Sequence, residues 1–136
     1  MSLVIDTPAV DLPAAPQEVW DYLADLAHLE TLLPADKCKD FRLEGDTCRF
    51  RIQGGIDIVL AITAAESPSR LQYGSQKGTP IRFHLDVALA PTGSGGTRAT
   101  LRGEADVNPF MRMMVESPLR ELFTSVSAAL QRQFSK

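Results

Sequence analysis

The chain has few cysteines, few aromatic residues and no excess of basic residues. Its 136 residues include two cysteines and one tryptophan, and the formal net charge is −3. The 14 Lys and Arg residues are scattered, so the chain lacks the basic patch typical of a nucleic-acid-binding protein. The longest apolar run covers only residues 58–62, whereas a bilayer span needs roughly 20 residues. We therefore expect no nucleic-acid partner and no stable insertion in a membrane.

The cysteines and the first residues indicate a reducing compartment. If Cys48 lies opposite Leu43 in a hairpin, about 16 Å of strand separates it from Cys38. A disulfide requires Cα atoms within about 7 Å, and a zinc site requires closely spaced Cys and His partners, which the sequence lacks. The first six residues lack the basic region and cleavage site of a signal peptide. We expect two reduced structural thiols, no metal site and a cytoplasmic protein.

The order of the sequence patterns predicts a single α+β domain over residues 1–136. Residues 3–10 are β-branched and apolar, which predicts a strand. Pro16 suits the first turn of a helix within 13–26, and a short second helix over 29–33 ends at Pro34. Short turns rich in Gly, Pro, Asp and Ser separate further strands at 40–44, 47–53, 56–66, 71–77, 81–90 and 97–106. This spacing is typical of an antiparallel meander of hairpins.

The chain ends in the pattern of a long amphipathic helix. Asn108 suits the N-cap, and Pro109 suits the first helical position. Ser117-Pro118 is expected to kink or restart the helix, because proline lacks the backbone N–H that continues it. Beyond that point one apolar stripe follows at helical spacing, formed by Leu119, Leu122, Phe123, Val126, Leu130 and Phe134.

Alternation along the strands predicts one nearly apolar face of the sheet. With a two-residue turn at Gly45-Asp46, this face holds Phe41, Leu43, Cys48, Phe50 and Ile52. The connection at Gly54-Gly55 must be an odd-length loop or contain a bulge if the face is to continue through Ile58, Leu60, Ile62 and Ala64. The next hairpins then place Ala64 opposite Tyr73, Ile62 opposite Ser75, Leu85 opposite Gly103, Val87 opposite Leu101 and Leu89 opposite Ala99.

Charges on the other face support the register of the last hairpin. In that register Arg82 falls opposite Asp106, His84 opposite Glu104 and Asp86 opposite Arg102. Each such pair contributes about 0.2–1 kcal/mol. The pattern favours His84 as a solvated cross-strand partner over a catalytic base. His28 has no nucleophile or metal ligand near it in the sequence.

A sheet with one apolar face needs a cover, and the C-terminal helix is the long amphipathic element available for it. Because one helix does not fill a long curved sheet, we expect a pocket between them, with space at Gly103 and Tyr22 as a further polar group near it. Its predicted lining is Phe50, Ile52, Ile58, Leu60, Tyr73, Ser75, Phe83, Leu85, Leu101, Gly103, Met111, Met114 and Leu122. The same residues could instead form a filled core.

Three segments resemble the START-like, or SRPBCC, superfamily with its helix-grip (Bet v 1-like) fold. Residues 16–26, PQEVWDYLADL, are similar to the superfamily's entry helix, and residues 28–34, HLETLLP, to its following short helix. Residues 106–119 resemble the start of the closing helix in small bacterial members. The resemblance implies a curved antiparallel sheet of about seven strands wrapped around a long C-terminal helix, with two short helices after the first strand.

The resemblance also implies a range of functions. Members of the superfamily bind lipids, sterols, polyketides, quinones or plant hormones, and some are cyclases or dehydratases. One fold hosts many activities, so a function inferred in this way is an analogy. No catalytic residue carries over, because the superfamily shares none across its branches.

The sequence contains no recognisable catalytic constellation. It lacks G-x-S-x-G, a P-loop, a G-x-G-x-x-G after the first strand and H-E-x-x-H. The carboxylates Asp57, Asp86, Glu104 and Asp106 alternate onto the polar face, and only Glu66 is predicted on the inner side, near a strand end. Tyr73 has no convincing acid–base partner, and Trp20 fits a core anchor of its helix. We therefore predict no catalytic residue, no metal and no cofactor.

Three functions fit these observations. The first, which we favour, is binding or transport of a small hydrophobic molecule such as a lipid, a polyketide or a quinone-like compound. The second is a polyketide cyclase or dehydratase, which would need a buried acid–base pair beside Tyr73. The third is a protein-interaction or chaperone-activator module that uses the outer sheet face or the apolar patch at Phe110–Met114.

Overall fold

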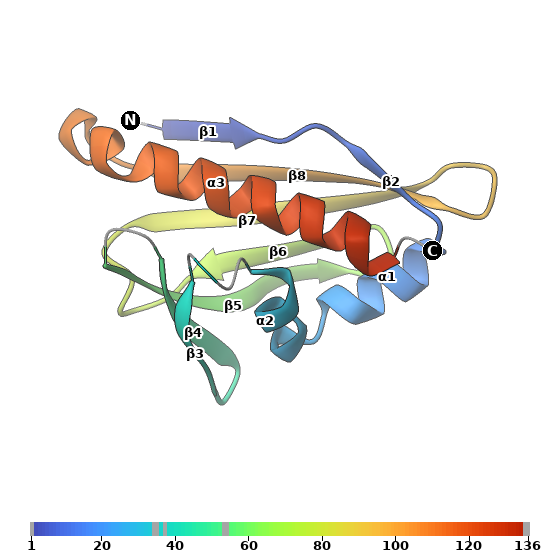
Figure 1. Cartoon of the computed structure of the whole chain (residues 1–136), viewed down its shortest axis with the longest axis horizontal. Helices are drawn as coiled ribbons and strands as arrows, with labels where there is room; N and C mark the ends of the chain where they lie inside the picture. Colours follow the sequence, from blue (N-terminus) through green and yellow to red (C-terminus); the bar gives the residue numbers. More distant parts are fainter. Residues whose placement is uncertain (1, 34–35, 37, 53–54, 135–136) are drawn as a thin grey trace.

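One antiparallel sheet with helices on its concave side makes up the computed structural model, which describes residues 2–33, 36, 38–52 and 55–134 (Figure 1). The strand order is β1-β8-β7-β6-β5-β4-β3, and β2 also pairs with β8. The strands are β1 (Ser2–Asp6), β2 (Val10–Leu12), β3 (Lys39–Glu44), β4 (Thr47–Ile52), β5 (Ile56–Glu66), β6 (Arg70–Ser75), β7 (Arg82–Pro91) and β8 (Thr97–Asp106). The helices are α1 (Pro16–Leu23), the 3-10 turn η1 (Leu26–His28), α2 (Leu29–Leu32) and α3 (Pro109–Phe134). This is the predicted α+β helix-grip architecture.

The predicted first strand is divided in two. Pro8 has no backbone N–H and therefore cannot continue the ladder with β8. The backbone N–H and the hydroxyl of Thr7 both donate to the Leu101 carbonyl, and pairing resumes where Val10 lies opposite Ala99. The first strand thus contributes β1 and β2 to the same edge of β8.

The entry helix is shorter than the sequence predicts. α1 ends at Leu23, and the Asp25 carboxylate accepts a hydrogen bond from the Ala27 N–H to begin η1. Trp20 packs against the core as predicted, and its indole N–H donates to the Arg70 carbonyl of β6. Pro34, expected to end the second helix, lies outside the described residues, as do Gln53 and Gly54.

The hairpin registers are mostly those predicted. Leu43 lies opposite Cys48, and Phe50 lies opposite Ile58, so β3, β4 and β5 share one inner face. The prediction for β5 and β6 is wrong by two residues: Ile62 lies opposite Tyr73, and Leu60 lies opposite Ser75. The error has two causes: Glu66 pairs with Arg70, so the turn holds three residues and not two, and a bulge between Ile62 and Ala64 adds a second shift. Ala64 therefore lies opposite Gln72, and it is exposed.

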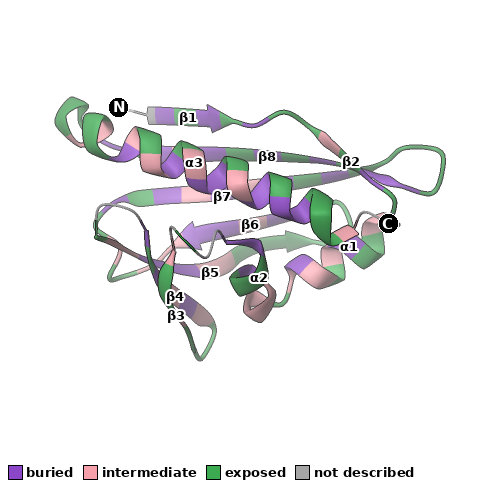
Figure 2. Cartoon of the chain, in the orientation of Figure 1, coloured by how far each residue is buried: buried purple, intermediate pink, exposed green. Residues whose placement is uncertain are grey.

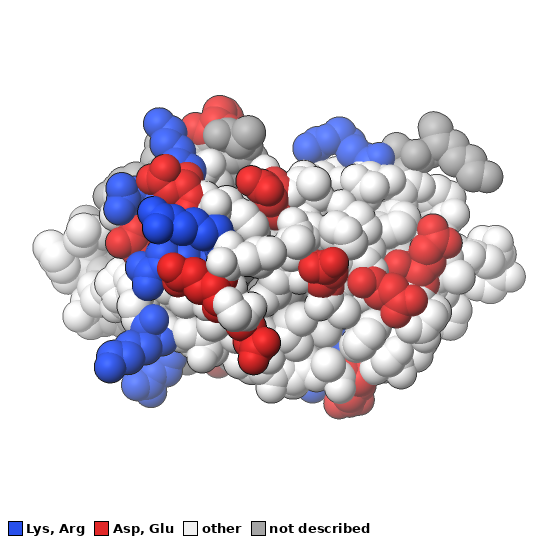
Figure 3. All heavy atoms as spheres, turned by 90° about the horizontal axis from the view of Figure 1, so that it is seen from below, with Lys and Arg blue, Asp and Glu red and all other residues white. Residues whose placement is uncertain are grey.

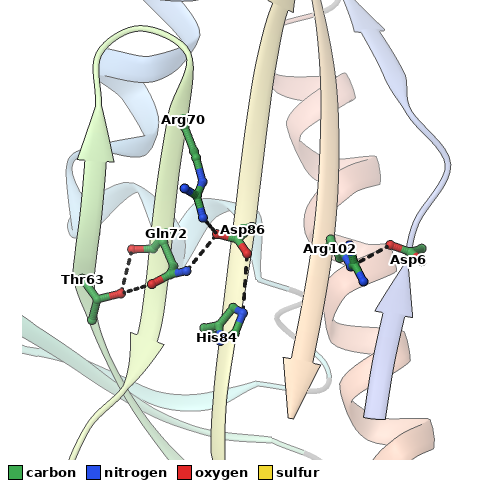
Figure 4. Close-up of polar contacts among 7 residues, drawn as sticks. All are labelled: Asp6, Thr63, Arg70, Gln72, His84, Asp86 and Arg102. Carbon is green, nitrogen blue, oxygen red and sulfur yellow. Dashed lines mark hydrogen bonds and ion pairs between the residues drawn. The ribbon is translucent and has the colours of Figure 1, made fainter. Parts of the chain in front are cut away.

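The outer face differs from prediction in its contacts, although the β7–β8 register is the predicted one. Asp86 accepts hydrogen bonds from Arg70 Nη2 at 3.0 Å and Gln72 Nε2 at 2.9 Å, both on β6 (Figure 4). His84 Nε2 lies 3.5 Å from Asp86 Oδ2, and Arg102 Nε lies 3.6 Å from Asp6 Oδ1 on β1. The predicted positions opposite one another are confirmed, but the side chains pair differently. Asp86 and Arg102 bond to flanking strands, and His84 lies beside Asp86 of its own strand.

The C-terminal helix runs without interruption from Pro109 to Phe134, so Pro118 does not restart it. The Asn108 side chain accepts a hydrogen bond from the Met111 N–H, which confirms the predicted N-cap. Pro118 leaves the carbonyl of Met114 without its helical donor, and Met114 is 58% exposed, so water can reach this turn. α3 packs against β1, β2, β8 and α2, with its buried face toward the sheet (Figure 2).

Phe123 of α3 packs directly on Gly103 of β8. A Cβ atom built at Gly103 would lie 2.0 Å from Phe123 Cε2, which is impossible without movement of the ring or the strand. The sequence prediction that Gly103 leaves space for a ligand is therefore wrong. Gly103 instead leaves space for an aromatic ring, which also lies 6.2 Å from the ring of Phe83.

We expect Gly103→Ala to destabilise the fold by about 1–3 kcal/mol, because the added methyl group overpacks the contact with Phe123. Urea denaturation measures this loss. Phe123→Leu introduced into Gly103→Ala should cost less than the two single changes added together. Thr100→Val, on the exposed face of the same strand, is the control and should stay within about 0.5 kcal/mol of wild type. Equal effects of Gly103→Ala and Thr100→Val would contradict the packing described here.

Candidate functional site

The concave face of the sheet is built from transverse rows of inward-facing residues. One row runs Ile62, Tyr73, Leu85, Gly103 and Ile5, from β5 to β1. A neighbouring row includes Leu60 opposite Ser75 and Phe83 opposite Ala105. Nearly every side chain in these rows is apolar, which is why the face needs a cover.

The cover is shared among separate helices. α3 crosses the side formed by β1, β2 and β8, whereas α1 contacts β6 and β7, and η1 contacts β4. The middle strands therefore lie where the covers meet. Leu60 and Leu85 on these strands and Leu122 on α3 are buried at this boundary.

The structure brings most of the predicted lining residues together in one core. The apolar residues on the strands and Leu122 are buried, and Met111 is half-buried and packed against them. This set comprises Phe50, Ile52, Ile58, Leu60, Phe83, Leu85, Leu101 and Leu122. Met114 does not join it, because it lies with Phe110 and Met113 on the exposed side of the first turns of α3.

The polar groups predicted in the lining are all bonded to other parts of the chain. The Tyr73 hydroxyl donates to the Leu23 carbonyl at the end of α1. Burial raises the pKa of Tyr73 and keeps its hydroxyl protonated. The Ser75 hydroxyl accepts from the Phe83 N–H at 2.9 Å, and the Tyr22 hydroxyl bonds Thr31. Within the described residues, no buried side-chain nitrogen or oxygen lacks a partner.

Both cysteines are free, as predicted. Burial raises the pKa of Cys48 to about 11, and burial together with Asp36 raises the pKa of Cys38 to about 11. At neutral pH both groups are thiols and therefore poor nucleophiles. The described residues contain no group of three or more His, Cys, Asp or Glu side chains placed to hold a metal ion. None of the described helices is long and apolar enough to cross a membrane.

Sequence reasoning missed two features of this site. It placed Phe123 in the apolar stripe but not against Gly103, although a glycine facing an aromatic residue is a signal of close packing. It also missed the Leu23 carbonyl as the partner of Tyr73. Any residue can supply a backbone carbonyl, so no side-chain pattern indicates that contact.

Tyr73→Phe should destabilise the protein by about 1–2 kcal/mol, because the buried Leu23 carbonyl loses its donor. The free energy of unfolding from urea titration measures this loss. Tyr22→Phe is the matched control: its hydroxyl bonds at an exposed position, so the expected loss is about 0.5 kcal/mol. If Tyr73→Phe cost no more than Tyr22→Phe, the hydroxyl would not be holding α1 to the sheet.

Comparison with solved structures identifies the same fold in several proteins of low sequence identity. Norcoclaurine synthase from Thalictrum flavum superposes with a TM-score of 0.74 at 15% identity, covering 98% of this chain and 93% of that one. XoxI from Bacillus cereus superposes with a TM-score of 0.73 at 14% identity, covering 98% of this chain and 94% of that one. A protein from Thermus thermophilus gives 0.72 at 20% identity, with 97% of each chain covered. These similarities show the fold alone.

Comparison with sequence families gives a more specific result. No curated protein matches the sequence. The model of the family described as polyketide cyclase / dehydrase and lipid transport matches residues 7–135, nearly the whole chain. The SRPBCC-type resemblance and the Bet v 1-like architecture are thereby confirmed. The chain belongs to the polyketide cyclase / dehydrase and lipid transport family.

Proposed function

We propose that the protein binds a small hydrophobic molecule between the concave face of the sheet and α3, as a carrier or binding protein. The observation that carries this proposal is the divided cover of an apolar face: α3 packs on the β1–β2–β8 side, and other helices cover the rest. Leu60, Leu85 and Leu122 supply apolar side chains from both the strands and α3 to this region. Membership of a family that includes lipid transport supports the same function.

The chemistry of this region favours an uncharged ligand. The Tyr73 hydroxyl already donates to the Leu23 carbonyl and the Ser75 hydroxyl already accepts from the Phe83 N–H, so what remains of their hydrogen-bonding capacity is uncharged. A charged group brought here would lose its hydration without gaining a partner, at a cost of several kcal/mol. Selection then rests on shape and apolar contact, which suits lipid-like, polyketide-like or quinone-like molecules.

Entry of the ligand requires side chains to move. Phe123 occupies the space beside Gly103, so the ligand must take its volume from the boundary between α3 and the middle strands. A site of this kind opens as the ligand binds, through a minor conformation that the ligand stabilises. A location in the cytoplasm, where free thiols persist, is part of this proposal.

A tryptophan at Leu85 tests the proposal. Wild type should raise the fluorescence of Nile red, a neutral apolar dye, in a saturable titration, and Leu85→Trp should abolish the effect by filling the boundary region. Met114→Trp places the same ring at an exposed position and should leave uptake unchanged. If circular dichroism shows that Leu85→Trp does not fold, Leu60→Phe is the substitute variant. It fills less of the boundary region and should reduce dye uptake less strongly.

Two results would contradict the proposal. One is equal dye uptake by wild type and by folded filling variants. The other is loss of uptake in Met113→Gln, since Met113 is 84% exposed and this loss would assign the dye to the surface patch of Phe110, Met113 and Met114. Native mass spectrometry of protein purified from its own host would then identify any co-purified molecule.

A further inference from the structure

The sheet has two edge strands, and they differ in how well they are protected from pairing with another strand. β3 forms one edge and β1 forms the other. In Figure 1, β1 runs along the upper border of the sheet, with β8 on one side and no described strand or helix on the other. An edge strand presents unpaired backbone N–H and C=O groups, which accept a further strand unless the chain prevents it.

The β3 edge carries several features that oppose such pairing. Its register with β4 shifts between Lys39 and Arg42, and Asp40 has a positive φ of 58°, so the strand is irregular. Four of its residues are charged: Lys39, Asp40, Arg42 and Glu44. Seen from below, Lys and Arg side chains lie beside Asp and Glu side chains at the left, where β3 and β4 are (Figure 3). Charges and bulges of this kind block the addition of a strand.

The β1 edge has none of these protections. Residues Ser2–Asp6 pair with β8 in one unbroken register and include no proline, no Lys and no Arg. The single charged residue, Asp6, lies at the end of the strand, where its Oδ1 is 3.6 Å from Arg102 Nε (Figure 4). Val4, in the middle of the strand, is 37% exposed. β1 is therefore the edge that is open to a further strand.

The backbone of β1 alternates between groups bonded to β8 and groups that point away from it. The Thr7 N–H donates to the Leu101 carbonyl, in the register that continues the β1–β8 pairing. Because bonded and non-bonded pairs alternate in an antiparallel ladder, Leu3 and Ile5 bond to β8. The N–H and C=O groups that face the open side belong to Ser2, Val4 and Asp6. A further strand would bond to these groups without disturbing the ladder to β8.

We propose that β1 pairs with β1 of a second copy of this chain, in antiparallel orientation, with Val4 on the two-fold axis. A two-fold axis brings the same surface of both copies together, so Val4 meets Val4, and Ser2 meets Asp6. Each of these pairs exchanges two backbone hydrogen bonds. Leu3 then lies opposite Ile5 of the other copy, so apolar side chains meet across the axis on the concave face of the joined sheet.

The charge on β1 favours this register. In the two-fold antiparallel pair, the Asp6 carboxylates of the two copies lie at opposite ends of the paired strands. A parallel pair in register would place them side by side, and like charges directly opposite one another destabilise a strand pair. A second copy therefore complements both the backbone and the side chains of this edge.

Exposed apolar surface borders the same edge. Among the described residues, four of the five exposed large apolar side chains lie on β1 or on the first turns of α3: Val4, Phe110, Met113 and Met114. α3 contacts β1, and Figure 1 shows its first turns beside the start of β1. A copy bound at β1 approaches this surface, which enlarges a pairing of only five residues from each chain. Because stable interfaces bury roughly 1,200–2,000 Å² in total, we expect a weak and reversible dimer. This interface goes beyond the ligand site proposed under α3.

Sedimentation velocity over a concentration series tests the proposal, with protein that carries no N-terminal tag. Wild type should change from monomer to dimer with a dissociation constant in the micromolar range. Val4→Pro removes the N–H on the open side while the ladder to β8 keeps its bonds, and it should weaken the dimer at least about thirtyfold. Val4→Thr keeps this N–H and a strand-forming side chain, and it should change the dissociation constant less than about fivefold.

Charge substitutions test the position of the axis. Val4→Lys and Val4→Glu each place like charges opposite one another and should weaken self-association about tenfold. A mixture of these two variants should form a heterodimer about tenfold tighter than either variant forms alone, because opposite charges then meet. Leu43→Lys is the control: it adds the same charge at an exposed apolar position of β3, the opposite edge, and should leave the dimer unchanged.

The proposal is overturned if wild type stays monomeric up to about 1 mM, or if folded Val4→Pro dimerises as wild type does. It is also overturned if the mixture of Val4→Lys and Val4→Glu associates no more tightly than each variant alone, or if Leu43→Lys weakens the dimer as much as Val4→Lys. Circular dichroism checks the folding of every variant. If Val4→Pro does not fold, the Lys and Glu variants decide the question.

Discussion

An antiparallel sheet with one apolar face is stable in water only when something covers that face, and this requirement organises the whole chain. No single element is large enough to do so. The N-terminal segment supplies α1, η1 and α2, the C-terminal segment supplies α3, and they cover different strands. The proposed hydrophobic site lies at the boundary between these covers.

The two covers are attached by different physical means. Two hydrogen bonds to β6 hold α1: Arg70 accepts from Trp20, and Tyr73 donates to Leu23. Gln17 of α1 also bonds Ser67 in the turn between β5 and β6. Such directional contacts fix both the position and the orientation of α1. α3 is held by apolar packing, including Phe123 on Gly103, and apolar attraction is not directional. If one cover moves to admit a ligand, this difference favours α3.

Much of this arrangement follows from the sequence, because the alternation of apolar and polar residues along a strand indicates which residues share a face of the sheet and how strands pair. The β7–β8 pairing is as predicted, and Phe50 and Ile58 share one face as predicted. Alternation fails at Thr63, where a bulge inserts a residue without any change of pattern. It also fails to place Phe123, because the fit of a ring against a glycine depends on the angle at which α3 crosses the sheet. Side-chain type indicates what can be buried, but the volume left over depends on how the elements pack.

The same reasoning explains why the sequence predicts the interior of the site better than its edge. Interior residues are apolar on every neighbouring strand, so errors in one register leave the face apolar. An open groove near β5 combines Asp21 and Asp25 from the helical segment with Asp46 from the turn between β3 and β4. Each of these residues has an ordinary local role, as a helix, cap or turn residue, and only the fold places them around a common space.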